Sequence, residues 1–336
     1  MRLYRLPKAE GIDDLTLTEA ADPAPQHGQV LLWMHAWSLN YRDLMVANGR
    51  YNPNGMPPDL VPLSDGAGEV VAIGPGVHRV KPGDRVCPTF MQGWQGGEVI
   101  AEARQHSLGG GVDGVLAEHV LTGQEDLVHI PPHLSFEEAA TLPCAAVTAW
   151  NALYGARRLR PGETVLVLGT GGVSVFALQF ALAAGARVIA TSSSPAKLAR
   201  IRGLGPVDGI NYRERPEWQE AVHELTDGRA ADHVVEVGGA GTLARSVAAA
   251  RIGGHVGLIG VLTGGQIDPA PVMRRNVTLR GIFVGSREMF EAMNRAISRH
   301  TLRPVIDKVF DFTQAPAAYR YLEGASHVGK VVIRAG

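Results

Sequence analysis

The chain has 336 residues, 45% of them hydrophobic, and a formal net charge of −1. This length predicts two domains, and the near-neutral charge gives no electrostatic reason to bind nucleic acid or a membrane surface. There is no apolar run long enough to span a bilayer, and the N-terminus lacks a basic start followed by an apolar core. Two cysteines, Cys87 and Cys144, make no disulfide framework. These features predict a soluble, cytoplasmic globular protein.

The pattern of the first 145 residues is typical of a small β domain. Short strands of alternating polar and apolar residues, such as 29–37 and 69–73, are separated by segments rich in proline and glycine. Strands at this spacing predict a compact, barrel-like domain over residues 1–145. Four large apolar residues fit either a substrate entrance or the core of this domain: Trp37, Phe90, Met91 and Trp94.

The next segment carries the strongest functional signal. The apolar run 165–168 reads as a parallel strand buried on both faces, and a glycine turn leads from it into a helix. Glycines let the backbone turn sharply, and the free N–H groups of a helix start attract a pyrophosphate. The turn therefore predicts a dinucleotide site at Gly169, Gly171, Gly172 and Val173. Ser174 replaces the third glycine of the motif, and a glycine turn without any ligand is the alternative.

Further strand-like runs follow at 187–191, 209–212, 233–237, 255–260 and 278–284. Six short apolar strands with helical connections predict the doubly wound parallel sheet of a Rossmann domain, over residues 146–288. Ligands of such sheets bind beyond the carboxyl ends of the strands. By topology, the residues expected to contact the cofactor are Val237, Gly238, Ile259, Gly260, Val261, Phe283, Val284 and Ser286.

The residues after the second strand of this domain indicate which cofactor binds. A carboxylate at this place would hydrogen-bond the ribose of NAD, but the chain has Thr191 followed by three serines and Lys197. Hydroxyl groups and a lysine can hold a 2′-phosphate, so Ser192, Ser193 and Lys197 favour NADPH over NADH. The serines can also cap the next helix while Lys197 is solvated, and both interpretations can hold together.

The alternation of strands and helices that is typical of a Rossmann domain ends at about residue 287. A helix over 288–298 leads to an apolar segment at 304–310, and a last strand is expected at 330–334. Residues 289–336 are therefore expected to complete the first domain. The Rossmann domain would be an insertion, with a ligand cleft between the two.

Five short motifs run through nearly the whole chain, at 38–43, 64–70, 81–86, 169–173 and 329–332. Together they resemble the medium-chain dehydrogenase/reductase superfamily, and most closely its zinc-free quinone oxidoreductase-like branch. The resemblance implies an α/β fold with a GroES-like, mostly β catalytic domain and a six-stranded Rossmann domain, assembled as a homodimer or homotetramer. It also implies that Thr148 and Tyr212 contact the cofactor.

Zinc-dependent members of this superfamily polarise a carbonyl group with a catalytic zinc ion, which needs three Cys, His or carboxylate ligands. By resemblance, the three ligand positions here are Asn40, Ser64 and Cys144. An amide, a hydroxyl and one thiol make a poor zinc site. The four-cysteine structural lobe of the family is also missing, so no zinc is expected.

Without zinc, hydrogen-bond donors have to stabilise the negative charge that develops on the substrate oxygen. Asn40 is the first candidate, and Tyr41 and Tyr51 are phenols that can orient a carbonyl or relay a proton. All three also fit packing roles. Arg42 and Asp43 are expected to form a local ion pair rather than an acid–base couple.

The sequence therefore predicts a zinc-independent, NADPH-dependent oxidoreductase that acts on a quinone, an aldehyde or ketone, or an enone. One alternative is an alcohol dehydrogenase with a residual metal site around Cys144 and Asp65. The other is a non-catalytic protein that senses NADPH.

Overall fold

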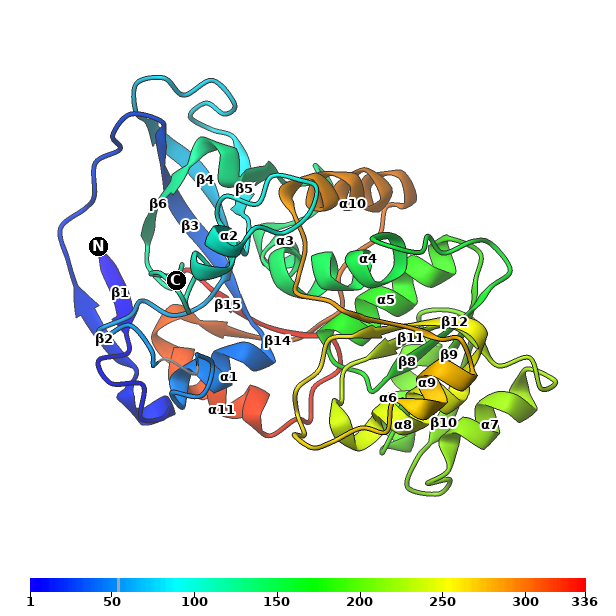
Figure 1. Ribbon diagram of the computed structural model, residues 1–336. Helices are drawn as coiled ribbons and strands as arrows, with labels where there is room; N and C mark the ends of the chain where they lie inside the picture. The colour runs from blue at the N-terminus through cyan, green and yellow to red at the C-terminus, as the bar shows by residue number, and fades with distance from the viewer. Residues whose placement is uncertain (53–54) are drawn as a thin grey trace. The chain divides into compact units, whose positions relative to one another are not determined.

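The computed structural model describes residues 1–52 and 55–336, and it divides into two units (Figure 1). The β unit comprises residues 1–147 and 285–336, and the Rossmann unit comprises residues 148–284. Residues 285–288, including Ser286, thus belong to the β unit and not to the Rossmann domain in which we expected them. Within the described residues, no helix is both long enough and apolar enough to cross a membrane.

Six parallel strands form the sheet of the Rossmann unit, in the order β10-β9-β8-β11-β12-β13. Their bounds are β8 Thr164–Leu168, β9 Arg187–Ser192, β10 Val207–Asn211, β11 Ala231–Glu236, β12 Ala250–Leu258 and β13 Thr278–Gly281. Every residue of β8 is buried, as expected for the central strand of a sheet covered on both faces. The strand order reverses between β8 and β11, which is where ligands of such sheets bind.

The helices of this unit are α4 Val147–Tyr154, α5 Gly172–Ala183, α6 Pro195–Arg202, α7 Trp218–Leu225, α8 Ala240–Ala249 and α9 Ala270–Arg274. Helix α5 has buried apolar residues on most sides because it packs directly on the sheet. The predicted Rossmann fold is confirmed. Most strand bounds differ from the predicted ones by a few residues, and Tyr212 lies just beyond the end of β10.

The β unit is built around a seven-stranded sheet in the order β14-β15-β3-β4-β5-β7, with β6 also paired to β3. The strands are β3 Gln29–Leu39, β4 Asp65–Ile73, β5 Arg85–Pro88, β6 His119–Gly123, β7 Leu127–His129, β14 Ile306–Asp311 and β15 Lys330–Arg334. A separate hairpin pairs β1 Arg2–Arg5 with β2 Thr16–Glu19. The last strand lies inside the sheet, parallel to β14 and antiparallel to β3.

The helices of this unit are α1 Tyr41–Ala47, α2 Ala101–Gln105, α3 Phe136–Ala139, a π-helical turn Leu142–Ala146, α10 Arg287–His300 and α11 Ala315–Glu323. The four large apolar residues that could have formed a substrate entrance, Trp37, Phe90, Met91 and Trp94, are all buried. Trp37 packs against Phe312, with 4.9 Å between ring centroids. These residues therefore belong to the interior of the β unit.

Candidate functional site

Asn40 lies at the junction between strand β3 and helix α1, where its extended backbone (φ −128°, ψ 159°) makes it the N-cap residue. Its N–H donates to Asp43 Oδ2 at 2.7 Å, so the acidic residue of the first turn holds the cap. The Asn40 side chain is buried, and its Oδ1 accepts a hydrogen bond of 2.5 Å from Lys330 Nζ. Lys330 Nζ also donates to Leu39 O at 2.5 Å. The amide oxygen of Asn40 thus faces a buried cation.

Asp65, at the start of β4, is a fully buried carboxylate in the same region of the β unit. Its Oδ1 accepts a hydrogen bond of 2.7 Å from Ser64 Oγ, and its Oδ2 accepts one of 3.1 Å from Cys144 N. Burial raises the pKa of Asp65, and the charge of Lys330 opposes this effect. Burial also lowers the pKa of the Lys330 ammonium and raises that of the Cys144 thiol. Electrostatics therefore couple Lys330, Asp65 and Cys144.

These donors do not fit a zinc ion. The Asn40 oxygen already accepts from an ammonium group, and the Ser64 hydroxyl donates to Asp65. Across the residues that the structure describes, no three His, Cys, Asp or Glu side chains lie close enough to hold a metal ion.

The Arg42 guanidinium, which is only 9% exposed, pairs with Asp43. Arg42 NH1 lies 3.2 Å from Asp43 Oδ1, which confirms the expected ion pair, and it also donates to the carbonyl oxygens of Leu108 and Gly109. The guanidinium stacks on the Tyr51 ring at 4.2 Å, so Tyr51 is held in the buried cluster that begins at Asn40. Tyr41, in contrast, is 50% exposed.

The glycine turn has the geometry that a pyrophosphate site needs. Gly169 has φ +72°, which other residues adopt at a cost, and a Cβ placed on Gly171 would meet no atom within 4 Å. The turn opens directly onto the N-terminus of α5, a helix of 12 residues. Open space beside Gly171 and the free N–H groups of α5 fit a dinucleotide phosphate.

Strand β9 ends with buried Thr191 and Ser192. Ser194 is the N-cap of α6, and its Oγ accepts from the Lys197 N–H at 3.4 Å, while its own N–H donates to Ser192 Oγ at 3.3 Å. One of the three serines therefore caps helix α6, in agreement with the prediction that the serines can cap the helix after the second strand. Ser192, Ser193 and Lys197 all lie at the carboxyl end of β9, where the adenosine end of a dinucleotide is expected.

The predicted residues at the ends of β11 and β12 lie together. A Cβ on Gly260 would come within 1.8 Å of Val237 O, so the segment 259–261 packs directly on the turn 237–238. Sequence analysis missed the residue that shapes this turn: buried Glu236, whose Oε1 accepts from the N–H groups of Gly238 (2.6 Å) and Gly239 (3.0 Å). A carboxylate at the end of an apolar strand, two residues before a pair of glycines, was the available signal.

The remaining predicted cofactor residues have different environments. Thr148 is buried, whereas Tyr212, Val261 and Phe283 are 41%, 65% and 39% exposed. Val284 has φ +54°, an uncommon value for a β-branched residue, and its carbonyl accepts from Asn151 Nδ2 at 2.7 Å. Ser286 is the N-cap of α10 and accepts from the Met289 N–H at 3.2 Å. Ser286 therefore has a structural role in the β unit, as the residue that caps α10.

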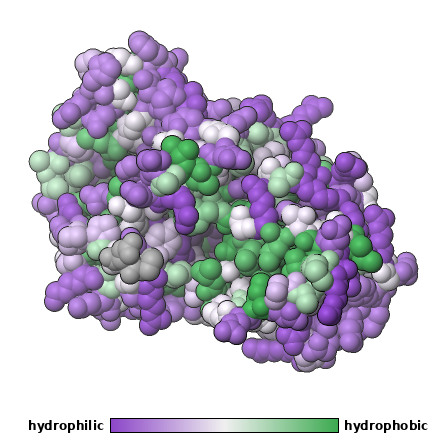
Figure 2. All heavy atoms as spheres, viewed as in Figure 1, coloured by the Kyte–Doolittle hydropathy of each residue, from purple (hydrophilic) through white to green (hydrophobic). Residues whose placement is uncertain are grey.

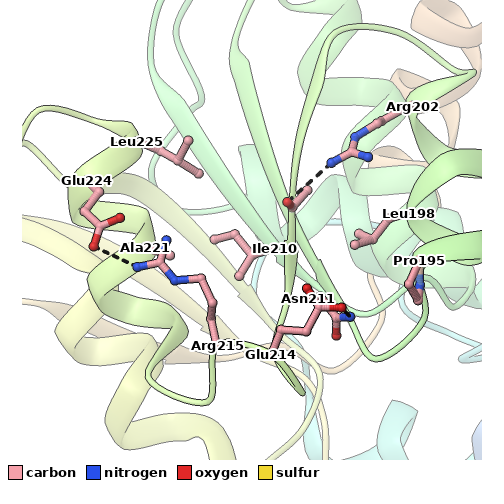
Figure 3. Close-up of a pocket in the computed structure, with 11 residues that line it drawn as sticks. Pro195, Leu198, Arg202, Ile210, Asn211, Glu214, Arg215, Ala221, Glu224 and Leu225 are labelled. Atoms are coloured by element: carbon pink, nitrogen blue, oxygen red, sulfur yellow. Dashed lines mark hydrogen bonds and ion pairs between the residues drawn. The ribbon is translucent and has the colours of Figure 1, made fainter.

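A pocket of about 470 Å³ lies between α6, β10 and α7 of the Rossmann unit (Figure 3). Leu198, Ile210, Ala221 and Leu225 give it apolar walls, and Arg202 donates to Gly209 O at 3.5 Å. The predicted residues Ser192, Ser193, Lys197 and Tyr212 do not line it. This pocket is therefore separate from the predicted cofactor residues.

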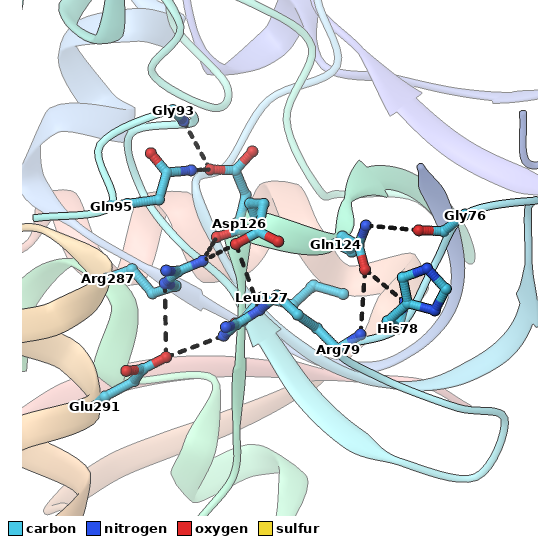
Figure 4. A network of polar contacts seen from close by, with 11 residues as sticks. Gly76, His78, Arg79, Gly93, Gln95, Gln124, Asp126, Leu127, Arg287 and Glu291 are labelled. Carbon is cyan, nitrogen blue, oxygen red and sulfur yellow. Dashed lines mark hydrogen bonds and ion pairs between the residues drawn. The ribbon is translucent and has the colours of Figure 1, made fainter. Parts of the chain in front are cut away.

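A polar network in the β unit joins the loop at 93–95 to the start of α10 (Figure 4). Arg287 donates to Glu125 through its side chain and to Trp94 O through its backbone N–H, at 3.0 Å. Asp126 Oδ1 accepts from the Gly93 N–H at 2.6 Å. Here ion pairs and backbone hydrogen bonds hold the chain in place.

Comparisons with known proteins agree with this architecture. Residues 26–132 match the alcohol dehydrogenase GroES-like domain family, and residues 172–299 match the zinc-binding dehydrogenase family. A zinc-type alcohol dehydrogenase-like protein of Schizosaccharomyces pombe is 43% identical over 333 residues, covering 96% of each chain.

Two solved structures are also similar. An NAD-dependent alcohol dehydrogenase has a TM-score of 0.91 and 33% identity, covering 100% of both chains. The 2-octenoyl-CoA carboxylase reductase CinF, solved with NADP and 2-octenoyl-CoA, has a TM-score of 0.87 and 28% identity, covering 99% of this chain and 87% of that one. With the glycine turn, the Rossmann sheet and the GroES-like domain, these matches show that the chain belongs to the medium-chain dehydrogenase/reductase superfamily and is one of its NAD(P)-dependent oxidoreductases.

Proposed function

We propose that the protein is a zinc-independent, NADPH-preferring reductase of a quinone, an aldehyde or ketone, or an enone, of the quinone oxidoreductase-like type. One observation carries the proposal: the oxygen of Asn40 accepts a hydrogen bond from Lys330 at the place where metal-dependent relatives hold a zinc ligand. A buried ammonium there supplies positive charge without a metal. The same contact places a positive charge 2.5 Å from the Asn40 oxygen, which disfavours a second cation there.

The reaction needs a stabilised oxygen anion. When bound, the reduced nicotinamide supplies a hydride to a carbon of the substrate, and the displaced electron pair moves to the substrate oxygen. In this reaction the Asn40 amide is the proposed donor to that oxygen; in the structure its nitrogen is buried, and a hydrogen bond of the Asn40 side chain lowers the pKa of Asp65, so the amide has to turn from Asp65 to the substrate. A proton from water then completes the alcohol, the hydroquinone or the reduced enone. Tyr51 holds the neighbouring Arg42 and is the second candidate donor.

Preference for NADPH follows from the segment after β9. Between Thr191 and Arg200 there is no carboxylate that would repel a 2′-phosphate, and Lys197 and Arg200 are both cationic. The hydroxyl groups of Ser192 and Ser193 add donors at the same end of the strand. An NAD-dependent neighbour and an NADP-bound neighbour are both similar to this chain, so the local charge is the argument for NADPH.

An activated carbon–carbon double bond deserves a test alongside quinones. CinF was solved with 2-octenoyl-CoA, whose acyl chain has a double bond next to the carbonyl group. Hydride addition to such a double bond also moves negative charge to the carbonyl oxygen. The Asn40 amide can therefore serve quinone, carbonyl and enone substrates alike.

The test is NADPH oxidation by protein that has been exhaustively treated with chelator, using an ortho-quinone, an aldehyde and an enone as acceptors. We expect turnover with at least one acceptor and no increase on adding zinc. Activity that appears only after zinc is restored would support a metal-dependent alcohol dehydrogenase. NADPH binding without turnover on any acceptor would support a non-catalytic sensor.

Self-association is part of the proposal, as a homodimer or homotetramer in the cytoplasm. Figure 2 shows apolar residues gathered on the face of the Rossmann unit where Figure 1 places α9. Val261, Leu262 and Met273 are 65%, 51% and 73% exposed, and β13 is an edge strand of the sheet. Light scattering of the purified protein should give at least twice the mass of one chain, and a monomer would refute this part of the proposal.

A further inference from the structure

The pocket of about 470 Å³ in the Rossmann unit lies beside β10, an edge strand of the sheet. The helices that precede and follow this strand in the chain, α6 and α7, form its walls (Figure 3). Small-molecule sites in proteins have volumes of about 300–1,000 Å³. The pocket is therefore large enough for a small molecule, and it shares no residue with the predicted cofactor site.

The floor of the pocket is apolar. Leu198 of α6, Ile210 of β10 and Ala221 of α7 line it, and they are only 4%, 4% and 1% exposed, so they form a fixed surface of the core. Leu225, which is half-buried, continues this surface along α7. Hydrocarbon placed on such a surface is removed from water, which is favourable. The floor therefore favours a ligand with an apolar body.

Arg202 places an unmatched positive charge at this floor. The side chain is exposed and donates to Gly209 O at 3.5 Å, which is long for a hydrogen bond. Among the residues that the structure describes, no acidic side chain forms an ion pair with Arg202. Arg215, which also lines the pocket, is in contrast paired with Glu224 at 2.7 Å. Arg202 is therefore the arginine that can pair with an incoming anion.

Gly209 makes the room for this arginine. Glycine inside a strand is unfavourable unless something approaches it closely, and the backbone of Gly209 does not have a positive φ. A Cβ on Gly209 would lie 2.8 Å from Arg202 NH2 and 3.1 Å from Leu198 Cδ2. The missing side chain thus lets the guanidinium lie against the strand, beside the apolar floor.

We infer that this pocket is a binding site for a medium-chain monocarboxylate, whose carboxylate pairs with Arg202 and whose hydrocarbon chain lies on the apolar floor. A planar guanidinium can donate two parallel hydrogen bonds to a carboxylate. The inference goes beyond the proposed function, because no step of hydride transfer involves these residues.

The acidic residues of the pocket favour a ligand with a single negative charge. Glu214 and Glu224 both line it, and Glu214 accepts from Asn211 Nδ2 at 2.5 Å rather than from a cation. These carboxylates would repel a phosphate dianion or a nucleotide more strongly than they repel a single carboxylate. One negative charge also matches the one unpaired arginine.

Isothermal titration calorimetry of the full chain tests the site, with octanoate as the ligand and octanol as its uncharged analogue. We expect octanoate to bind with a stoichiometry of about one per chain. Octanol should bind at least about tenfold more weakly, because it cannot form the charge-assisted hydrogen bonds with Arg202. No binding of octanoate, or equal affinity for the two molecules, would overturn the inference.

Arg202→Gln removes the cation from the pocket. The matched control is Arg213→Gln, because Arg213 is an exposed arginine just after β10 that does not line the pocket. The Kd of octanoate should rise at least about tenfold in Arg202→Gln and change by less than about twofold in Arg213→Gln. An unchanged Kd in Arg202→Gln would mean that octanoate binds elsewhere on the protein, and the inference would be wrong.

Gly209→Ala tests the site without changing the net charge. The new Cβ should displace the Arg202 guanidinium, so octanoate should bind more weakly, and thermal unfolding without octanoate shows whether the variant is folded. Wild-type affinity in folded Gly209→Ala would overturn the assignment of the site. These measurements need no turnover. A protein that reduces no acceptor would therefore refute the proposed function but not this site, so the two failures are distinguishable.

Discussion

The Ser174 hydroxyl donates a hydrogen bond of 2.6 Å to the carbonyl oxygen of Leu168, the last residue of β8. Ser174 stands where the third glycine of the dinucleotide motif permits close contact between helix and strand. The serine is 2% exposed, so the helix still packs tightly on the strand. A small side chain that hydrogen-bonds to the strand thus stands here in place of the glycine, which has no side chain.

We therefore predict that Ser174→Ala binds NADPH almost as well as the wild type, within about twofold. The free energy of unfolding should fall by about 1 kcal/mol, because one buried hydrogen bond is lost. Cofactor fluorescence titration and urea unfolding measure the two quantities. A large loss of NADPH affinity at normal stability would contradict this, since it would mean that the hydroxyl contacts the cofactor.

Lys197→Glu should weaken NADPH binding much more than NADH binding. The new carboxylate places a like charge near the 2′-phosphate, and the expected loss for NADPH is about 10- to 100-fold, or about 1.4–2.8 kcal/mol. Lys308→Glu, an exposed lysine of the β unit, is the control. Equal losses for both cofactors would show that Lys197 does not distinguish them.

Asn40→Ala should reduce kcat by about 100-fold, because a donor to the developing oxygen anion is removed. The Kd of NADPH should remain nearly unchanged. Asn48→Ala, at the opposite end of the same helix, is the matched control, since Asn48 is exposed and its side chain donates to Leu44 O at 2.7 Å. Unchanged turnover in Asn40→Ala would remove Asn40 from the catalytic machinery.

Two buried histidines predict acid sensitivity of the Rossmann unit. His233 on β11 and His255 on β12 are in register, with ring centroids 5.6 Å apart, and each is 1% exposed. Burial lowers the pKa of each to about 4, and the charges of Arg157 and Arg280 act in the same direction. Glu163 Oε2, 3.4 Å from His233 Nε2, opposes the shift on His233.

The sign of the effect follows from proton binding. The folded-state pKa values lie below the unfolded value of 6.5, so the unfolded chain binds more protons between pH 6.5 and about 4. The free energy of unfolding should therefore fall as the pH is lowered through this window, by up to about 1.4 kcal/mol per pH unit for each histidine.

In His255→Leu the free energy of unfolding should change less with pH than in the wild type. In His78→Leu, a change at an exposed histidine, it should change with pH as in the wild type. Urea unfolding at about pH 7.5 and about pH 5 gives the difference for each variant. Equal pH dependence in the wild type and His255→Leu would show that His255 does not contribute to the acid sensitivity.

The sequence was most informative where a pattern follows directly from backbone geometry. The buried run of β8, the glycine turn and the spacing of the later strands predicted the Rossmann fold, and β15 was predicted at its observed bounds. Asn40 could be singled out because it stands where relatives have a metal ligand. Lys330 could not, because its contact depends on how β15 pairs with β3, which no local pattern reveals.

Side-chain networks were the least predictable part. Glu236 looked like an ordinary strand residue, yet its carboxylate holds the turn after β11. Tyr41 and Tyr51 looked equivalent in sequence, but Tyr51 is stacked on Arg42 and Tyr41 is half exposed. Such differences depend on residues far apart in the chain, and local patterns cannot distinguish them.

The position of β15 has a consequence for synthesis of the protein. The Rossmann unit is one uninterrupted segment, 148–284, whereas the β unit needs both 1–147 and 285–336. On the ribosome, the whole Rossmann unit is therefore synthesised before the β unit is complete. Strand β3 meanwhile has an open edge until β15 is made, because these two strands are paired in the finished sheet. The N-terminal half, although synthesised first, is thus the last to be completed, and its exposed strand edge is the part of the nascent chain that most needs a chaperone.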